Sequence, residues 1–156
     1  GTDGRMPAML CRHYMLTHPS TVLDTDPLSD ALQVMVRKHH QEILVVTEDG
    51  RWAGELTSFV FSRLLMPADA GEGPTSADVA TAETAADVDN RLLPYLGRLV
   101  ADFADKDIPT VEPDTPLTDA LRHLSKGILR LPVVEGPEQK LVGALSSLTI
   151  LRRFQF

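Results

Sequence analysis

The chain has 156 residues and a formal net charge of −7, and its length is about that of one ordinary domain. Hydrophobic residues make up 43 % of the sequence, so a packed core is expected and wholesale disorder is excluded. Six carboxylates and no Lys or Arg lie between residues 67 and 90, which leaves the rest of the chain nearly neutral. The lack of a basic stripe argues against a nucleic-acid partner.

Cysteine usage and hydropathy bear on the cellular location. Cys11 is the only cysteine, so no internal disulfide can form, as is usual in a reducing cytoplasm. No apolar run approaches the roughly 20 residues of a membrane-spanning helix, and no secretory leader is visible in the sequence. We therefore expect a cytoplasmic protein without a membrane partner.

The first structural unit is expected over residues 8–67, after an N-terminal tail at residues 1–7 that we interpret as a remnant of cloning. Asp26 and Pro27 are expected to begin its main helix as N-cap and first residue, and Thr57 to cap its second helix. A continuous apolar run and an Asp-Gly turn indicate two paired strands. A short leading helix is followed by the order β-α-β-β-α, with elements over residues 10–15, 21–23, 28–36, 43–46, 52–56 and 58–65.

Residues 68–90 are acidic and rich in alanine. We interpret them as a linker between two units, in which residues 77–86 form at most a frayed helix. Two interpretations of this segment remain open, a solvated spacer and an acidic tether that binds a partner protein.

The second unit is expected over residues 91–156. Apolar residues at helical spacing from Leu92 to Phe103 predict a lengthened leading helix. The elements expected after it are a strand, a helix, two paired strands and a last helix that begins at Ser146, with the first four over residues 109–112, 116–124, 130–135 and 140–145.

The two units are copies of each other. The stretch of residues 26–32 recurs at residues 115–121, so that Pro27 and Pro116 match with an offset of 89 residues. The same offset relates residues 21–22 to 110–111 and residues 54–58 to 143–147. Three matches in order at one offset predict a single supersecondary unit that is used twice.

The segments Gly127–Glu135 and Leu141–Ser146 resemble the strand–turn–strand–helix signature of CBS domains, the small module named after cystathionine β-synthase. This resemblance implies an α/β fold of two β-α-β-β-α CBS repeats related by a pseudo-twofold axis, a Bateman-type module with two clefts that usually forms a homodimer. It also implies a regulatory protein rather than an enzyme. AMP, ADP, ATP or S-adenosylmethionine are the ligands that it implies, and the signal would pass to an effector protein that the sequence does not identify.

The ribose-binding aspartates of such clefts have no counterpart in this chain. The resemblance places them three residues after Thr57 and Ser146, where Val60 and Thr149 stand. Each lost charge-assisted hydrogen bond weakens binding by about 1.5–3 kcal/mol. Thr149 still offers a hydroxyl group, whereas Val60 offers no polar group, so we rank the second cleft above the first.

Ser146 is expected at a helix N-terminus, where its hydroxyl and the first amides could meet a phosphate that Arg130 also binds. Apolar side chains around it are expected to bracket a flat base. The candidate ligand-binding residues are Ile108, Thr110, Arg130, Leu131, Pro132, Ser146 and Thr149 in the second repeat, with Thr21 and Thr57 in the first. Helix capping is the competing interpretation for Ser146 and Thr57, and a surface side chain is the competing one for Arg130.

The sequence raises two further hypotheses. His39, His40 and Glu42 suggest a metal site, but adjacent histidines point to different faces and no spaced third ligand is evident, so no metal is expected. The alternative to a ligand sensor is a dimeric interaction scaffold whose clefts are filled by its own apolar side chains.

Overall fold

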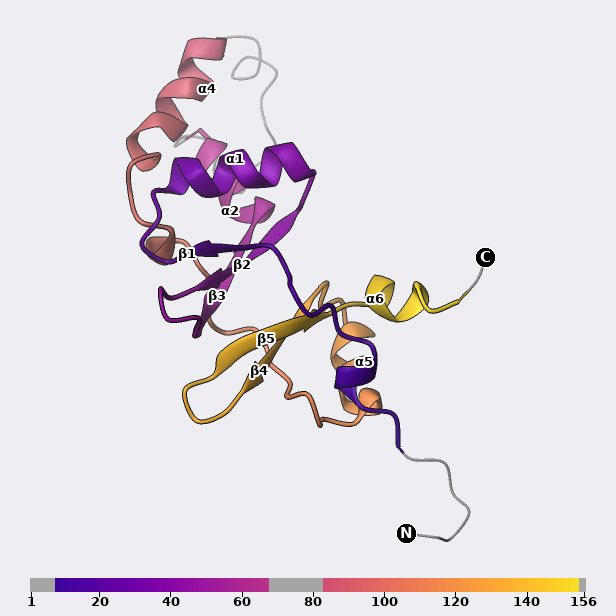
Figure 1. Ribbon diagram of the computed structural model, residues 1–156. Helices are drawn as coiled ribbons and strands as arrows, with labels where there is room; N and C mark the ends of the chain where they lie inside the picture. The colour runs from indigo at the N-terminus through magenta and orange to yellow at the C-terminus, as the bar shows by residue number, and fades with distance from the viewer. Residues whose placement is uncertain (1–7, 68–82, 155–156) are drawn as a thin grey trace, which may run out of the picture.

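The computed structural model describes residues 8–67 and 83–154 (Figure 1). The tail at residues 1–7 and residues 68–82 of the expected linker lie outside the described residues, as do residues 155–156. No helix within the described part of the chain is long and apolar enough to span a membrane. The first half contains η1 (Cys11–His13), β1 (Thr21–Leu23), α1 (Leu28–Lys38), β2 (Glu42–Val46), β3 (Trp52–Thr57) and α2 (Ser58–Leu65).

The second half repeats this order with fewer regular strands. It contains α4 (Ala85–Leu92), η2 (Leu93–Tyr95), η3 (Val100–Asp102), α5 (Leu117–Leu124), β4 (Leu131–Glu135), β5 (Lys140–Leu145) and α6 (Ser147–Leu151). In the first sheet β1 pairs with β2 in parallel and β2 pairs with β3 antiparallel, whereas the second sheet consists of the antiparallel pair β4 and β5. The fold is thus the expected mixed α/β arrangement of two β-α-β-β-α-like units.

The start of α1 differs from the sequence-based expectation. Pro27 occupies the N-cap position, and no side chain caps the helix. The carboxylate of Asp26 instead accepts a hydrogen bond of 3.0 Å from the Leu23 backbone N–H, because the turn after β1 brings that donor closer than the helix amides. In the second repeat the Thr115 hydroxyl accepts from the Glu112 N–H at 2.9 Å in the same way. These two side chains close the strand-to-helix turn.

The strand expected at residues 109–112 is reduced to a single parallel bridge between Val111 and Val133. Two prolines explain the loss, because proline has no N–H to donate to a ladder. In the first repeat the Asp24 N–H donates to the Val46 carbonyl at 2.9 Å, and Pro113 stands at the position of Asp24. Pro132 also lies within β4, opposite this segment.

The lengthened leading helix expected for the second repeat is wrong. α4 ends at Leu92, and one 3₁₀ turn with Pro94 at its start leads to a break before the separate turn η3. Part of the acidic segment is instead well-formed helix, because Thr84 and Asp87 make a capping box at the start of α4. Arg91 anchors α4 to α2 by donating from Nε to the Leu65 carbonyl at 2.7 Å. The leading helix expected at residues 10–15 is likewise only the single turn η1.

Reciprocal backbone hydrogen bonds show the pseudo-twofold axis. The Leu16 N–H donates to the Ala144 carbonyl at 2.8 Å, and the Asp105 N–H donates to the Glu55 carbonyl at 2.8 Å. Adding 89 to Leu16 gives Asp105, and adding 89 to Glu55 gives Ala144, so each bond is the image of the other. Arg51 forms an isolated antiparallel β-bridge with Lys140, the equivalent residue of the second repeat. The pseudo-twofold axis therefore passes between these two residues.

The leading segments are exchanged between the repeats (Figure 1). Cys11 belongs to the apolar core of the second repeat, where it packs with residues of α5, β4 and β5. Val100 belongs to the core of the first repeat, with residues of α1, β2 and β3. Two symmetry-related backbone hydrogen bonds hold these segments in place. The Cys11 N–H donates to the Thr115 carbonyl, and the Val100 N–H donates to the Asp26 carbonyl, each at 2.9 Å. Each core is therefore completed by the other half of the sequence.

Truncating Val100 to alanine is expected to loosen the first repeat, although Val100 follows the linker in the sequence. The side chain is fully buried, so its loss should cost roughly 2 kcal/mol through lost burial and the cavity left behind. Native-state hydrogen exchange should show faster exchange in α1 and β2. The matched variant Val111→Ala should instead affect β4 and β5, and the same pattern from both variants would contradict the exchange of segments.

Candidate functional site

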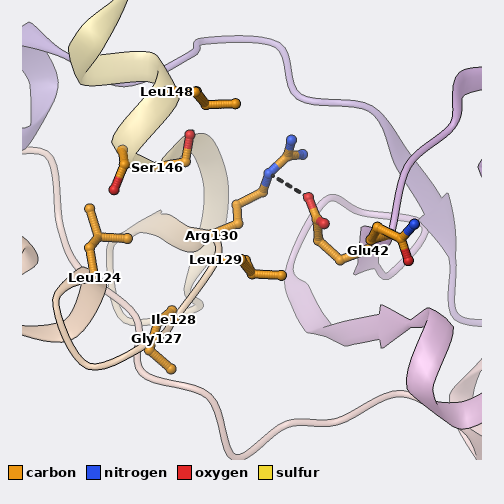
Figure 2. Close-up of a pocket in the computed structure, with 10 residues that line it drawn as sticks. Glu42, Leu124, Gly127, Ile128, Leu129, Arg130, Ser146 and Leu148 are labelled. Carbon is orange, nitrogen blue, oxygen red and sulfur yellow. Dashed lines mark ion pairs between the residues drawn. The ribbon is translucent and has the colours of Figure 1, made fainter.

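A cavity of about 370 Å³ lies between the two repeats. Most of its wall comes from the second repeat, from the loop before β4 and the start of α6, while the first repeat contributes the residues at the start of β2 (Figure 2). The lining residues are Gln41, Glu42, Leu124, Gly127, Ile128, Leu129, Arg130, Ser146, Ser147 and Leu148. The cavity thus depends on the relative setting of the two halves.

One ion pair crosses the pseudo-twofold axis inside this cavity. Arg130 Nε lies 3.2 Å from Glu42 Oε1, and the two side chains are only 19 % and 13 % exposed (Figure 2). The partners occupy equivalent positions. Ile43 pairs with Leu56 as Leu131 pairs with Leu145, so β2 and β4 correspond with an offset of 88, which maps Glu42 onto Arg130. Equivalent positions therefore carry opposite charges and hold the halves together.

A buried carboxyl group lies beside this ion pair. Leu44 pairs with Glu55 across the sheet, and because residues two apart on a strand share a face, Glu55 and Glu42 lie on one face of the sheet. Glu55 is 9 % exposed. Burial raises its pKa from 4.5 to about 7; the charges of Glu42 and Asp105 add to this rise, and Arg130 opposes it. One guanidinium here faces three carboxyl groups.

Ser146 is the N-cap of α6. Its Oγ accepts from the Thr149 N–H at 3.2 Å, and the Thr149 hydroxyl accepts from the Ser146 N–H at 3.0 Å and donates to the Ser146 carbonyl at 2.9 Å. This capping box occupies the Thr149 amide and its hydroxyl. The hydroxyl proton of Ser146 remains available for a ligand in the cavity, because the Ser146 oxygen acts as acceptor in the cap.

The start of α2, the equivalent helix of the first repeat, is covered by the protein itself. The Ser58 hydroxyl donates to Gln41 Oε1 at 2.6 Å, and the Ser58 N–H at the start of α2 donates to the Gln41 carbonyl at 2.8 Å. Gln41 therefore covers the N-terminus of α2. Its counterpart in the second repeat is Leu129, which has no polar side-chain atom and is 61 % exposed. This difference leaves the start of α6 open to the cavity and the start of α2 closed.

The predicted site residues do not all meet in the cavity. Arg130 and Ser146 line it. Leu131 is packed in the core of the second repeat, and Pro132 is fully buried. Thr149 contributes to the cap of α6. The remaining candidates do not line the cavity: Ile108 and Thr110 are half-buried before β4, Thr21 is exposed in β1, and Thr57 is the N-cap residue of α2 without a side-chain cap bond.

Sequence reasoning missed the first repeat's contribution. Gln41 and Glu42 reach the cavity across the pseudo-twofold axis, which a search within one repeat does not find. Aligning the repeats with the offset of 88 would have placed Glu42 opposite Arg130, and opposite charges at equivalent positions near an axis indicate a contact. Within the described residues, no group of His, Cys, Asp and Glu side chains is arranged to hold a metal ion.

The comparisons with known proteins agree with this geometry. The family model of the CBS domain matches residues 11–57 and 100–155, which is more than half of the chain. The chain therefore belongs to the CBS domain family, and it is a tandem CBS pair. No curated protein sequence matches it.

Solved CBS pairs share the fold at low sequence identity. The CBS-pair protein CBSX2 from Arabidopsis thaliana is 22 % identical with a TM-score of 0.71, covering 94 % of each chain. CBSX2 in complex with AMP is 21 % identical with a TM-score of 0.66, covering 92 % of this chain and 94 % of that one. The CBS pair of MJ0100 in complex with 5′-methylthioadenosine and S-adenosyl-L-methionine is 18 % identical with a TM-score of 0.62, covering 95 % and 97 %.

Proposed function

We propose that this CBS pair is a regulatory module that binds an adenosyl ligand in the cavity of the second repeat. The observation that carries the proposal is the position of the cavity, whose walls come from both halves and include their shared ion pair. A ligand bound there has a different affinity for each relative setting of the halves, so it shifts the population between them. Support comes from CBSX2, solved with AMP, and from MJ0100, solved with two adenosyl compounds.

Ligand-dependent thermal unfolding tests this proposal. Adenosine, 5′-methylthioadenosine, S-adenosylmethionine, AMP and ATP are each titrated into the folded protein while the unfolding temperature is followed. A ligand at 100 times its Kd stabilises the fold by about 2.7 kcal/mol, so at least one titration should give a saturable rise. No rise with any of the five at millimolar concentration would contradict the proposal.

Replacing Ser146 by alanine is expected to weaken the binding of such a ligand roughly three- to tenfold, because one hydrogen bond of about 0.5–1.5 kcal/mol is lost. The change also removes a helix cap, so it should lower stability by about 0.5–2 kcal/mol. Thr84→Ala separates the two effects, since Thr84 forms the same kind of capping box in α4 without lining the cavity. Isothermal titration that finds equal affinity in both variants would exclude Ser146 from the site.

A second candidate function is a dimeric interaction scaffold. Large apolar side chains are exposed on the outer helices, with Val36 of α1 73 %, Phe59 of α2 64 % and Leu148 of α6 75 % exposed. Such surfaces suit association with a second copy of the chain or with a partner protein. Sedimentation equilibrium together with the titrations distinguishes the candidates, because a scaffold associates with increasing concentration and gives no thermal response to any ligand.

A further inference from the structure

The charged residues that line the cavity are one glutamate and one arginine. Arg130 is the only lysine or arginine among the lining residues, and it is already paired with Glu42. Glu55 lies on the same sheet face as Glu42, and Asp105 is bound to the backbone of Glu55 by two hydrogen bonds of 2.8 and 2.9 Å. A ligand therefore enters a cavity whose single positive group is neutralised and is backed by further carboxyl groups.

We propose that Glu42 is a specificity-determining residue, which restricts the cavity to adenosyl compounds that carry no phosphate at the 5′ position. The proposal rests on the proposed function and names its ligand class: an adenosine unit with an uncharged or positively charged 5′ substituent, such as a thioether or a sulfonium.

A phosphate would have to compete with Glu42 for Arg130. Displacing Glu42 would leave its largely buried carboxylate next to Glu55 and without its ion-pair partner. An unpaired charge in a protein interior has a large free-energy cost. Glu55 is buried as well and its carboxyl group already interacts unfavourably with that of Glu42, so a Glu42 carboxylate released from Arg130 would lie beside another acidic group. An uncharged 5′ group leaves the Glu42–Arg130 pair intact, and a positively charged one is attracted by the surrounding carboxylates.

The start of α6 compensates only weakly for the negative charge of Glu42. The helix has only five residues, so its dipole is small. Its Thr149 amide is already bonded to Ser146, and the Ile150 N–H donates to the Ser146 carbonyl at 3.2 Å. The donors that remain at this helix start are the Ser146 hydroxyl and the Ser147 and Leu148 amides, all from residues that line the cavity. The volume of about 370 Å³ is also at the small end of ligand cavities, which suits a nucleoside better than a nucleoside triphosphate.

Isothermal titration of the unaltered chain gives the first test. 5′-Methylthioadenosine and S-adenosylmethionine should bind at least tenfold more tightly than AMP and ATP at the same pH and ionic strength, as expected when a buried charge pair must be broken for one class only. AMP binding as tightly as 5′-methylthioadenosine would overturn this inference and leave the proposed function standing. Failure of these four and of adenosine to bind would overturn the proposed function and the inference with it.

The second test asks whether Glu42 is responsible. Glu42→Gln should raise the affinity for AMP about tenfold, lower that for S-adenosylmethionine, and change that for 5′-methylthioadenosine by less than about threefold. Glu48→Gln is the matched control, because it makes the same change of charge at an exposed position in the turn between β2 and β3 and should leave all affinities unchanged. An unaltered ranking in a Glu42→Gln protein that unfolds cooperatively would overturn the inference.

Discussion

Replacing Gly54 by alanine is expected to destabilise the protein by about 3 kcal/mol. Gly54 lies in β3 with a φ of +126°, which L-residues with a side chain rarely adopt. A Cβ atom at this position would lie 3.0 Å from the carbonyl oxygen of Asp105 and 3.0 Å from the Cβ of Ala104. Asp105 cannot move away without loosening its two hydrogen bonds with Glu55, so the substitution strains the contact between the repeats.

Urea unfolding monitored by circular dichroism measures this loss. Gly97→Ala is the matched control, because a Cβ atom there meets nothing within 4 Å and the residue has no left-handed φ. Its effect should stay within about 0.5 kcal/mol. Equal stability of the two variants would show that the segment around Asp105 does not approach β3 as closely as the structure indicates.

The second repeat contains the image of this contact. A Cβ atom on Gly143 would lie 2.9 Å from the Leu16 carbonyl oxygen and 2.8 Å from Met15 Sδ. Gly143 corresponds to Gly54, and Leu16 to Asp105, with the offset of 89. The absence of a side chain at both glycines therefore leaves room for the leading segment of the other repeat. This close approach is a physical reason for glycine at the same position of both copies.

Replacing Glu55 by glutamine is expected to stabilise the protein above pH 7, by at most about 3 kcal/mol. The pKa of Glu55 is raised from 4.5 to about 7, chiefly by burial, so the folded state holds a proton that the unfolded chain has released between these pH values. The free energy of unfolding of the unaltered protein therefore falls as pH rises from about 4.5 to 7, and this loss is complete above pH 7. Glutamine does not ionise and avoids this cost.

Free energies of unfolding measured at pH 5 and pH 8 test the predicted direction of this pH dependence. The difference between Glu55→Gln and the unaltered protein should be small at pH 5 and large at pH 8, because the native carboxyl group is still largely protonated in the folded state at the lower pH. Glu48→Gln, at its exposed position, should give no such difference at either pH. A larger benefit at pH 5 than at pH 8 would be incompatible with a carboxyl group whose pKa is raised.

Much of the fold could be predicted because the sequence contains the pattern twice. The Asp-Pro-Leu and Thr-Pro-Leu stretches and the helical spacing of apolar residues predicted α1 and α5 and the paired strands. The exchange of leading segments could not be predicted, because an offset of 89 is the same whether Val100 packs on its own repeat or on the other one. The missing strand near Val111 could have been anticipated from Pro113 and Pro132, since two lost N–H donors weaken a ladder.

The candidate site was less predictable than the fold. The sequence predicts Arg130 and Ser146, because charge and helix capping can be recognised within one repeat. It suggests Glu42 only as a metal ligand, because the contact of Glu42 with Arg130 depends on how the two repeats meet. The pKa of Glu55 likewise depends on burial between the halves and on three charged neighbours from different segments, which sequence periodicity does not reveal.

The Glu42–Arg130 pair has a consequence for the ancestry of the chain. A solitary βαββα unit would lack the piece of core that the other copy supplies, so an ancestral form would have required two subunits related by a true twofold axis. Identical subunits place like residues opposite each other, and two glutamates or two arginines at this point would repel. Duplication within one polypeptide keeps the copies together at high effective concentration and lets the sequences diverge. Two identical units could not have this attraction, because it requires different residues at the two equivalent positions.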